Sequence, residues 1–348
     1  MTLTWAGFLL GCGFGVAARL GGFCLLRGLR QLLAGDAGAP ALRAFALALA
    51  VAIVTTQGLV WAGEIDVSQA VLLRSGFPAG GMLVGGILFG LGMSMARSCG
   101  ARALVLLAGG NLRALVVLAG LGLAAQASLT GVLVPVRQLL QGLGAVQFGG
   151  ASLPAWLGGL GLPADQAALV GVGAPVLALL AFALGGGLLR RAPREAAMAV
   201  IIGLLVTLGW WLTTHVEVDA FDPAPPSSLS FIGPVAEGLL YLQVAVGRAF
   251  SFGPAVVLGT LAGAALTALA TRSFVLEGFE RPGQLLRHLA GGLLMGFGGV
   301  LAVGCSIGQG LSGLSTLALA SFPACLGIII GACAGLATDH SFVKGEQK

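Results

Sequence analysis

The chain has 348 residues, of which 57% are hydrophobic, only 9% are charged and 59 are glycine, and its mean hydropathy is +1.00. A water-soluble domain carries about 25% charged residues, so this chain has too few polar side chains to cover a soluble globule, and it is too apolar to be disordered. The formal net charge of +5 is scattered singly along the chain, which argues against nucleic-acid binding. Because the apolar runs are continuous, they predict an all-α polytopic membrane protein in the lipid bilayer rather than a β-barrel.

Nine segments reach the roughly 20 apolar residues that a membrane-spanning helix needs. In chain order they are residues 4–20, 42–62, 80–97, 112–131, 168–189, 196–212, 252–271, 285–303 and 319–338. Four shorter apolar stretches cannot cross a bilayer and are too apolar for solvated loops, and they cover residues 24–33, 99–108, 230–241 and 305–315. These stretches are predicted to be re-entrant half-helices that line a cavity.

The orientation follows from the basic residues in the connections. Fifteen of the 18 Lys and Arg residues fall in one set of alternate connections, and only Arg74, Arg137 and Arg248 fall in the other. Since basic loops stay in the cytoplasm, we expect the N-terminus outside and the C-terminus inside.

An internal repeat links the two parts of the chain. Residues 85–99 align with residues 291–305 at an offset of 206, and the identical pairs are Gly85/Gly291, Gly86/Gly292, Leu88/Leu294, Gly90/Gly296, Gly92/Gly298, Ala96/Ala302 and Cys99/Cys305. The same offset places Ser230 opposite Cys24. The shared glycines also suit close packing of membrane helices.

The repeat predicts four spans, one linking span and four more spans. A single linking span turns the second half over, which gives an inverted-topology repeat of the kind found in secondary transporters. The expected divisions are residues 1–140 for the first half, 141–194 for the linker and 195–348 for the inverted half.

The six cysteines fall into two groups. Neither a Cys-x-x-Cys pair nor a nearby histidine supports a metal site. Three cysteines lie inside predicted spans, where a free thiol is usually a small buried apolar group; these are Cys12, Cys325 and Cys333. Cys24, Cys99 and Cys305 instead stand at junctions between a span and a short re-entrant stretch, which favours a functional role.

Together with Ser230, these three thiols would form a ladder of weak hydrogen-bond donors through the protein. A hard oxyanion such as sulfate prefers amide, hydroxyl or guanidinium donors, whereas a polarizable thiol suits a soft sulfur atom. Half-helices that begin after Cys99 and Cys305 would add the positive end of a helix dipole. Glycines let backbone N–H groups come close to a substrate, and they stand at positions 100, 304, 308 and 310. The pattern indicates an anion with a soft end.

Several motifs resemble the YeeE/YedE family of bacterial inner-membrane sulfur-compound transporters. The motifs are Phe23-Cys24 with Arg27-Gly28-Leu29-Arg30, Cys99-Gly100 with Gly110-Asn111-Leu112-Arg113-Ala114-Leu115, Ser228-Leu229-Ser230-Phe231, and Gly304-Cys305-Ser306-Ile307-Gly308-Gln309-Gly310. The resemblance implies thiosulfate uptake through a pore narrowed around Cys24, Cys99 and Cys305, without a cofactor. The matched motifs add Gly100, Gly304, Ser306 and Gln309 as candidates for the path, and the family implies a small soluble sulfur carrier of the TusA type as a cytoplasmic partner.

The resulting hypothesis is transport without covalent change, so the protein is not expected to be an enzyme. Thiosulfate would pass from Cys305 to Cys99 and then to Cys24. Three alternatives remain open: transport of another sulfur or selenium compound, a membrane sulfurtransferase that forms a cysteine persulfide, and a Cu(I) pathway, although no Met-x-x-Met pattern supports the last. Arg102 and Arg248 are candidates for attracting an anion at the two mouths, although a single loop arginine more commonly fixes topology.

Overall fold

The computed structural model describes residues 2–36, 38–216, 225–247, 249–279 and 282–338. Its long helices are α1 (Leu3–Leu20), α3 (Pro40–Trp61), α4 (Ala79–Ala96), α6 (Leu112–Leu129), α9 (Ala164–Gly185), α11 (Pro193–His215), α13 (Phe252–Ala270), α14 (Pro282–Leu301) and α15 (Ser321–Thr338). These nine helices coincide with the nine predicted spans, and no end differs by more than four residues. The prediction of an all-α polytopic fold is confirmed.

The four short apolar stretches are also helical. They form α2 (Leu25–Leu33), α5 (Gly100–Ala108), α12 (Ile232–Val244) and a single π-helical turn, η2 (Gly308–Gly313). The remaining elements lie at the periphery: α7 (Val134–Gln141), α8 (Leu153–Gly159), α10 (Leu188–Arg191), the 3-10 turn η1 (Ala245–Gly247), and the antiparallel strands β1 (Gly76–Pro78) and β2 (Ala145–Gln147).

Eight segments of the described chain are long and apolar enough to cross a membrane, and two of them combine a long helix with the short one that follows, α1 with α2 and α4 with α5. Helix α14 covers the ninth predicted span but is not among the eight. Its first half carries Gln284, Arg287 and His288, which lowers its hydropathy. Helix α9 ends four residues earlier than predicted because Gly187 adopts the left-handed conformation (φ +71°) that starts α10.

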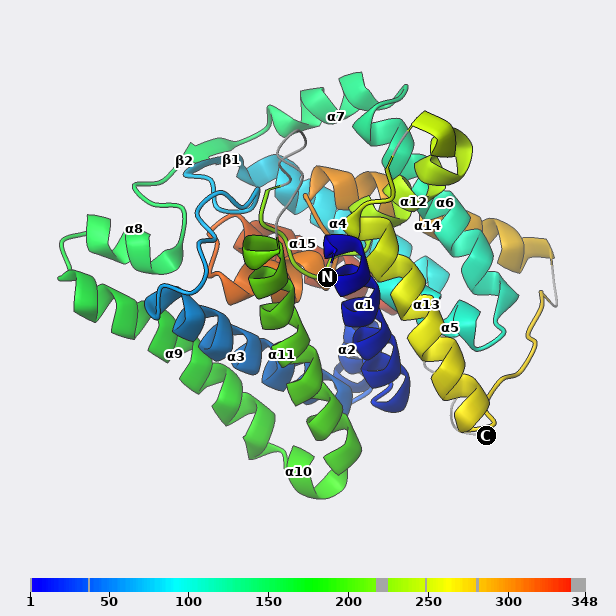
Figure 1. The fold of residues 1–348 in the computed structure, drawn as a ribbon, viewed down its shortest axis with the longest axis horizontal. Coiled ribbons are helices and arrows are strands. Elements are labelled where there is room, and N and C mark those ends of the chain that lie inside the picture. Colours follow the sequence, from blue (N-terminus) through cyan, green and yellow to red (C-terminus); the bar gives the residue numbers. More distant parts are fainter. Residues whose placement is uncertain (1, 37, 217–224, 248, 280–281, 339–348) are drawn as a thin grey trace.

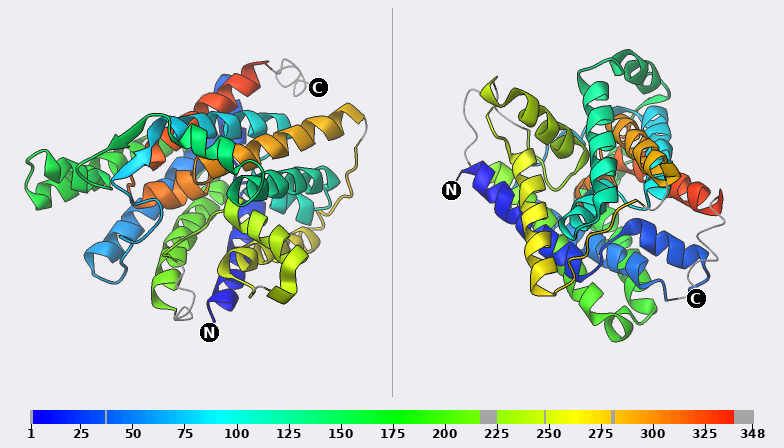
Figure 2. Two further views of the ribbon diagram at one scale, coloured as in Figure 1. Left: turned by 90° about the horizontal axis from the view of Figure 1, so that it is seen from above. Right: turned by 90° about the vertical axis from the view of Figure 1, so that its right-hand side faces the viewer.

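The long helices pack in two groups (Figures 1 and 2). Helices α4, α14, α15 and α6 form one group, in which α4 and α14 lie side by side, α15 packs on α4 and α6 packs on α14. In the other group α1 packs on α13 and on α11, and α11 packs on α3. Helix α9 packs mainly on α3 and α8, and only 28% of its apolar window is buried inside the protein, as expected for a helix that faces lipid.

Glycines bring these helices into backbone contact. In the α4–α15 pair, a Cβ added at Gly90 would lie 2.3 Å from Ile328 O, and one at Gly327 would lie 2.3 Å from Leu83 O. In the α4–α14 pair, a Cβ at Gly85 would lie 2.6 Å from Ala302 N. Real Cβ atoms do not approach other atoms so closely, so side chains larger than hydrogen are excluded at these crossings. The repeated glycines thus have the packing role that the sequence suggested.

Helices α4 and α14 run antiparallel. Gly85, near the start of α4, lies against Gly298 and Ala302 near the end of α14, whereas Gly92 lies against Gly291. Helices α1 and α11 are also antiparallel, since Gly13 lies against Leu205 and Gly21 lies against Met198.

Candidate functional site

The three cysteines singled out in the sequence all stand next to short helices. Cys24 directly precedes α2 and Cys99 directly precedes α5, each in an extended conformation. Cys305 lies between α14 and η2. Their side chains are buried, with exposed fractions of 8%, 4% and 1% respectively. The structure therefore places all three thiols inside the protein.

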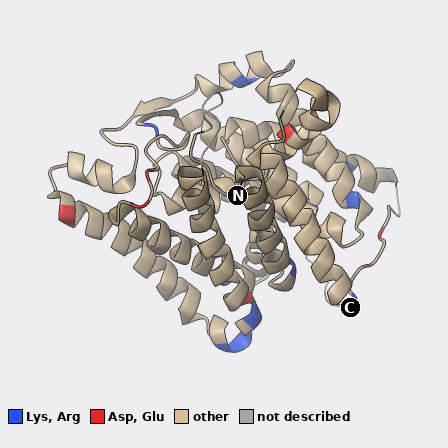
Figure 3. Ribbon diagram, in the orientation of Figure 1, with Lys and Arg blue, Asp and Glu red and all other residues tan. Residues whose placement is uncertain are grey.

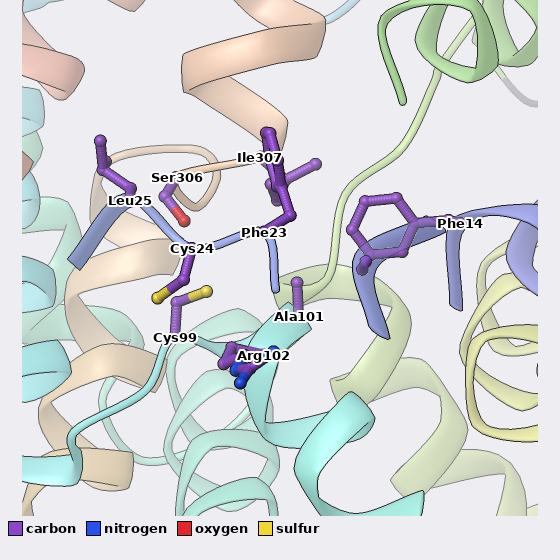
Figure 4. Close-up of a pocket in the computed structure, with 10 residues that line it drawn as sticks. Phe14, Phe23, Cys24, Leu25, Cys99, Ala101, Arg102, Ser306 and Ile307 are labelled. Carbon is purple, nitrogen blue, oxygen red and sulfur yellow. The ribbon is translucent and has the colours of Figure 1, made fainter. Parts of the chain in front are cut away.

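Cys24 and Cys99 meet at a narrow pocket, which we call the neck. Figure 4 shows the two side chains reaching toward each other, and the two thiols are close enough to interact electrostatically. The residues that line the neck are Phe14, Ala18, Phe23, Cys24, Leu25, Cys99, Ala101, Arg102, Ser306 and Ile307. Its volume is about 10 Å³, about the smallest space that holds a single water molecule. The neck is closed to any larger solute in this conformation.

Cys305 completes the group from the other half of the chain. It lies close enough to Cys99 for the two thiols to interact electrostatically, and Gly308 N donates a hydrogen bond to its Sγ at 3.3 Å. A Cβ added at Gly308 would lie 2.8 Å from Ser230 Oγ, so the absence of a side chain there lets Ser230 approach. The structure thus brings Cys24, Cys99, Cys305 and Ser230 into one series.

The other predicted site residues lie in the same region. Gly100 is the buried first residue of α5, and the buried hydroxyl of Ser306 lies next to the Cys99 thiol. Gly304 has a φ of +155°, which favours glycine at the turn before Cys305. Gln309 Nε2 donates hydrogen bonds to Ala302 O at 2.7 Å and Val303 O at 3.1 Å, so this side chain holds that turn.

Two wider cavities accompany the neck. The first, called the serine cavity, measures about 190 Å³ and is lined by Val71, Leu72, Trp210, Pro225, Pro226, Ser227, Ser228, Leu229, Ser230, Val303, Gly308 and Ser312. The second, called the arginine cavity, measures about 220 Å³ and is lined by Cys24, Leu26, Arg27, Arg30, Arg97, Arg102, Leu106 and Leu336. Cys24 and Arg102 line both the neck and the arginine cavity.

The two cavities lie toward opposite ends of α4. Leu72, at the serine cavity, is in the loop before α4, whereas Arg97, at the arginine cavity, directly follows α4. The 18 residues of α4 span about 27 Å at 1.5 Å per residue. Serine cavity, Ser230, Cys305, neck and arginine cavity therefore follow one another along the length of the bundle.

Buried hydrogen bonds hold in place the two segments that carry Ser230 and Cys305. Ser312 Oγ donates a hydrogen bond to Leu229 O at 2.7 Å, which ties η2 to the segment that carries Ser230. Ser315 accepts hydrogen bonds from Trp210 Nε1 at 3.1 Å and, through its carbonyl, from Gln57 Nε2 at 3.0 Å. Helices α3 and α11 are thereby fixed to the chain that follows Cys305.

Sequence reasoning missed part of the lining. Phe14 comes from the middle of α1, where an apolar residue resembles any other core residue. Arg27 and Arg30 entered the sequence analysis through the orientation rule and a family motif, and Arg97 through the orientation rule alone, so none of them was predicted to line a cavity. The other three cysteines do not line the neck, and each is half-buried where the sequence predicted burial; these are Cys12, Cys325 and Cys333. Cys325 lines an apolar cavity that also contains Leu25 and Ser306 of the neck.

The long apolar helices, with buried thiols at the start of short helices between two internal cavities, define a multi-pass membrane protein with an internal site. The family described as sulphur transport matches residues 20–334. The chain belongs to this family, which is the YeeE/YedE family that its motifs suggested.

Two relatives are thiosulfate transporters named TsuA. The chain is 26% identical to the one from Spirochaeta thermophila over 354 aligned positions, which cover 94% of this chain and 97% of that protein. It is 34% identical to the one from Escherichia coli (strain K12) over 113 positions, which cover 32% of this chain and 30% of that protein.

Proposed function

We propose that the protein imports thiosulfate across the bacterial inner membrane, from the serine cavity through the neck to the arginine cavity. The observation that carries this proposal is the convergence of the Cys24 and Cys99 thiols in the neck, with Cys305 beside them, between cavities at opposite ends of α4. Membership of the sulphur transport family and the names of the two relatives support a sulfur anion as the substrate.

The neck suits the terminal sulfur of thiosulfate better than a hard oxyanion. Apart from Ser306 and Arg102, its lining consists of thiols, aromatic rings and aliphatic groups. A neutral thiol is a weak donor to a polarizable sulfur atom, whereas a thiolate would repel a dianion. The cysteines would therefore guide the anion without forming a bond to it, and the anion would move only when the neck widens.

The two halves of the path are proposed to be inverted repeats. Under the offset of 206, α3 corresponds to α13, α4 to α14 and α6 to α15, while α1 corresponds to α11 only by its order in the chain. The pairs α1–α13 and α3–α11 are both packed, as are α6–α14 and α4–α15. The antiparallel contacts of α4 with α14 and of α1 with α11 support a two-fold axis in the membrane plane.

The serine cavity is proposed to face outward and the arginine cavity to face the cytoplasm. Basic residues at α10 and at the start of α11 lie at one edge of the bundle in Figure 3, and the positive-inside rule assigns that edge to the cytoplasm. A small sulfur carrier of the TusA type is the proposed partner at the cytoplasmic exit.

Uptake by cells that lack other sulfur importers tests the proposed function. Cells that produce the wild-type protein are expected to grow on thiosulfate as the sole sulfur source and to accumulate labelled thiosulfate, while an excess of sulfate does not slow uptake. Absence of uptake, with the protein present in the membrane fraction, would contradict thiosulfate as the substrate.

The absence of a covalent step is a separate prediction. Intact-mass spectrometry of the purified protein after exposure to thiosulfate is expected to show no added sulfur on Cys24, Cys99 or Cys305, because the substrate passes as an intact anion. A gain of one sulfur atom that disappears with a reductant and requires one of these cysteines would favour the sulfurtransferase alternative instead.

A further inference from the structure

Four guanidinium groups surround the cavity next to the neck. Arg27 and Arg30 come from α2, Arg97 directly follows α4, and Arg102 belongs to α5. Short helices from different parts of the first half thus deliver their charges to one cavity of about 220 Å³. A single arginine in a loop is explained by topology, but four around one cavity concentrate positive potential there, which attracts an anion.

None of the described residues that line the arginine cavity is acidic. Arg27 forms an ion pair with Glu195 of α11 at 2.8 Å, and this carboxylate does not line the cavity. Arg27 Nε is buried without a hydrogen-bond partner among the described residues. A buried donor of this kind is unfavourable unless a ligand or water accepts from it.

Cys24 and Arg102 connect this cavity to the neck, because both line the two spaces. The Cys24 thiol presents a soft, weakly polar surface, whereas the Arg102 guanidinium presents a planar fork of donors that matches two oxygens of an oxyanion. One residue at this boundary therefore suits a sulfur atom, and the other suits oxygen.

We propose that the arginine cavity is a binding site for the oxygen end of the transported anion, with Arg102 as the first guanidinium that it reaches beyond the thiols. This inference rests on the proposed function and deepens it. The neck selects for the soft sulfur atom, and the arginine cavity binds a small tetrahedral dianion through charge and oxygen contacts alone. Sulfate therefore binds in the arginine cavity although the thiols do not pass it.

Sulfate binding to the purified full-length protein tests this site without any transport. In isothermal titration calorimetry at low ionic strength, wild type is expected to bind sulfate. Arg102→Gln is expected to weaken binding by about tenfold or more, as loss of a charge-assisted contact predicts. Arg102→Lys, which keeps the charge without the fork, is expected to recover part of the affinity, and Arg30→Gln is expected to act in the same direction as Arg102→Gln.

The matched control is Arg74→Gln, because Arg74 is an exposed arginine in the loop before α4, away from the arginine cavity. This variant is expected to bind sulfate as wild type does, and size-exclusion chromatography would confirm that every variant is folded. The inference is overturned if wild type does not bind sulfate, or if folded Arg102→Gln and Arg30→Gln bind it as tightly as wild type. Sulfate binding that depends on these arginines, in a protein that does not import thiosulfate, would retain the anion site and reject only the proposed substrate.

Discussion

Replacing Gly90 with leucine is expected to prevent the helix bundle from assembling. A Cβ at this position would lie 2.3 Å from Ile328 O and 2.5 Å from Ala332 N. The obstruction is the backbone of α15, which cannot rotate away as a side chain can, so the cost should exceed the roughly 1–3 kcal/mol that is typical of overpacking a core. Size-exclusion chromatography of the solubilised protein, together with its yield in the membrane, would measure the loss.

Gly173→Leu is the matched control for Gly90→Leu, because it replaces a helical glycine with the same side chain. Gly173 also lies in a long apolar helix, α9, but no atom lies within 4 Å of a Cβ built there. Gly173→Leu is therefore expected to yield a monodisperse protein with nearly wild-type thermal stability. A folded Gly90→Leu protein, as stable as Gly173→Leu, would show that the backbone contact between α4 and α15 is not required.

Replacing Cys99 with alanine is expected to abolish thiosulfate uptake. Cys99 lies between Cys24, with which it forms the neck, and Cys305 from the second half of the chain. Alanine removes the thiol that is proposed to contact the substrate's sulfur at the middle of this series. We expect the initial rate of uptake to fall by about tenfold or more, the change that corresponds to losing about 1.4 kcal/mol of stabilisation along the path.

Further substitutions identify which property of the thiol matters. Cys24→Ala and Cys305→Ala are expected to reduce uptake in the same way, and Cys99→Ser tests whether a harder hydroxyl donor can replace the polarizable sulfur. Cys333→Ala is the control, since Cys333 is a half-buried cysteine of α15 that does not line the neck. Wild-type uptake by a stably folded Cys99→Ala protein would refute a thiol-lined path.

The positions of the membrane helices could be predicted closely because the requirement for apolar length acts locally. A bilayer demands about 20 apolar residues whatever surrounds them, so α6 and α13 begin at Leu112 and Phe252, where the sequence predicted them. The four shorter stretches were also recognisable, since they are too short to span and too apolar for loops. The prediction is less complete for α14, where Arg287 and His288 interrupt the apolar run.

Parts of the site could also be anticipated. Cys24, Cys99 and Cys305 stood out because each lies between a predicted span and a short apolar stretch. The offset of 206 also aligns Cys99 with Cys305. The Cys24 and Cys99 thiols converge because α2 and α5 both begin at the same place inside the bundle, which no spacing along the chain specifies. Phe14 was unremarkable for the same reason, because only the packing of α1 directs it to the neck.

By itself the sequence determined the class of protein and the positions of the helices, and it singled out the cysteines proposed to contact the substrate, because hydrophobic length and residue chemistry are properties of short segments. The tertiary structure alone decided the size of the neck, the cavities on either side of it and the gathering of four arginines around one of them. These features depend on close approach between helices far apart in the chain. Glycines permit that approach at crossings where an added Cβ would lie less than 3 Å from the neighbouring helix. A larger side chain at such a crossing would push the two helices apart.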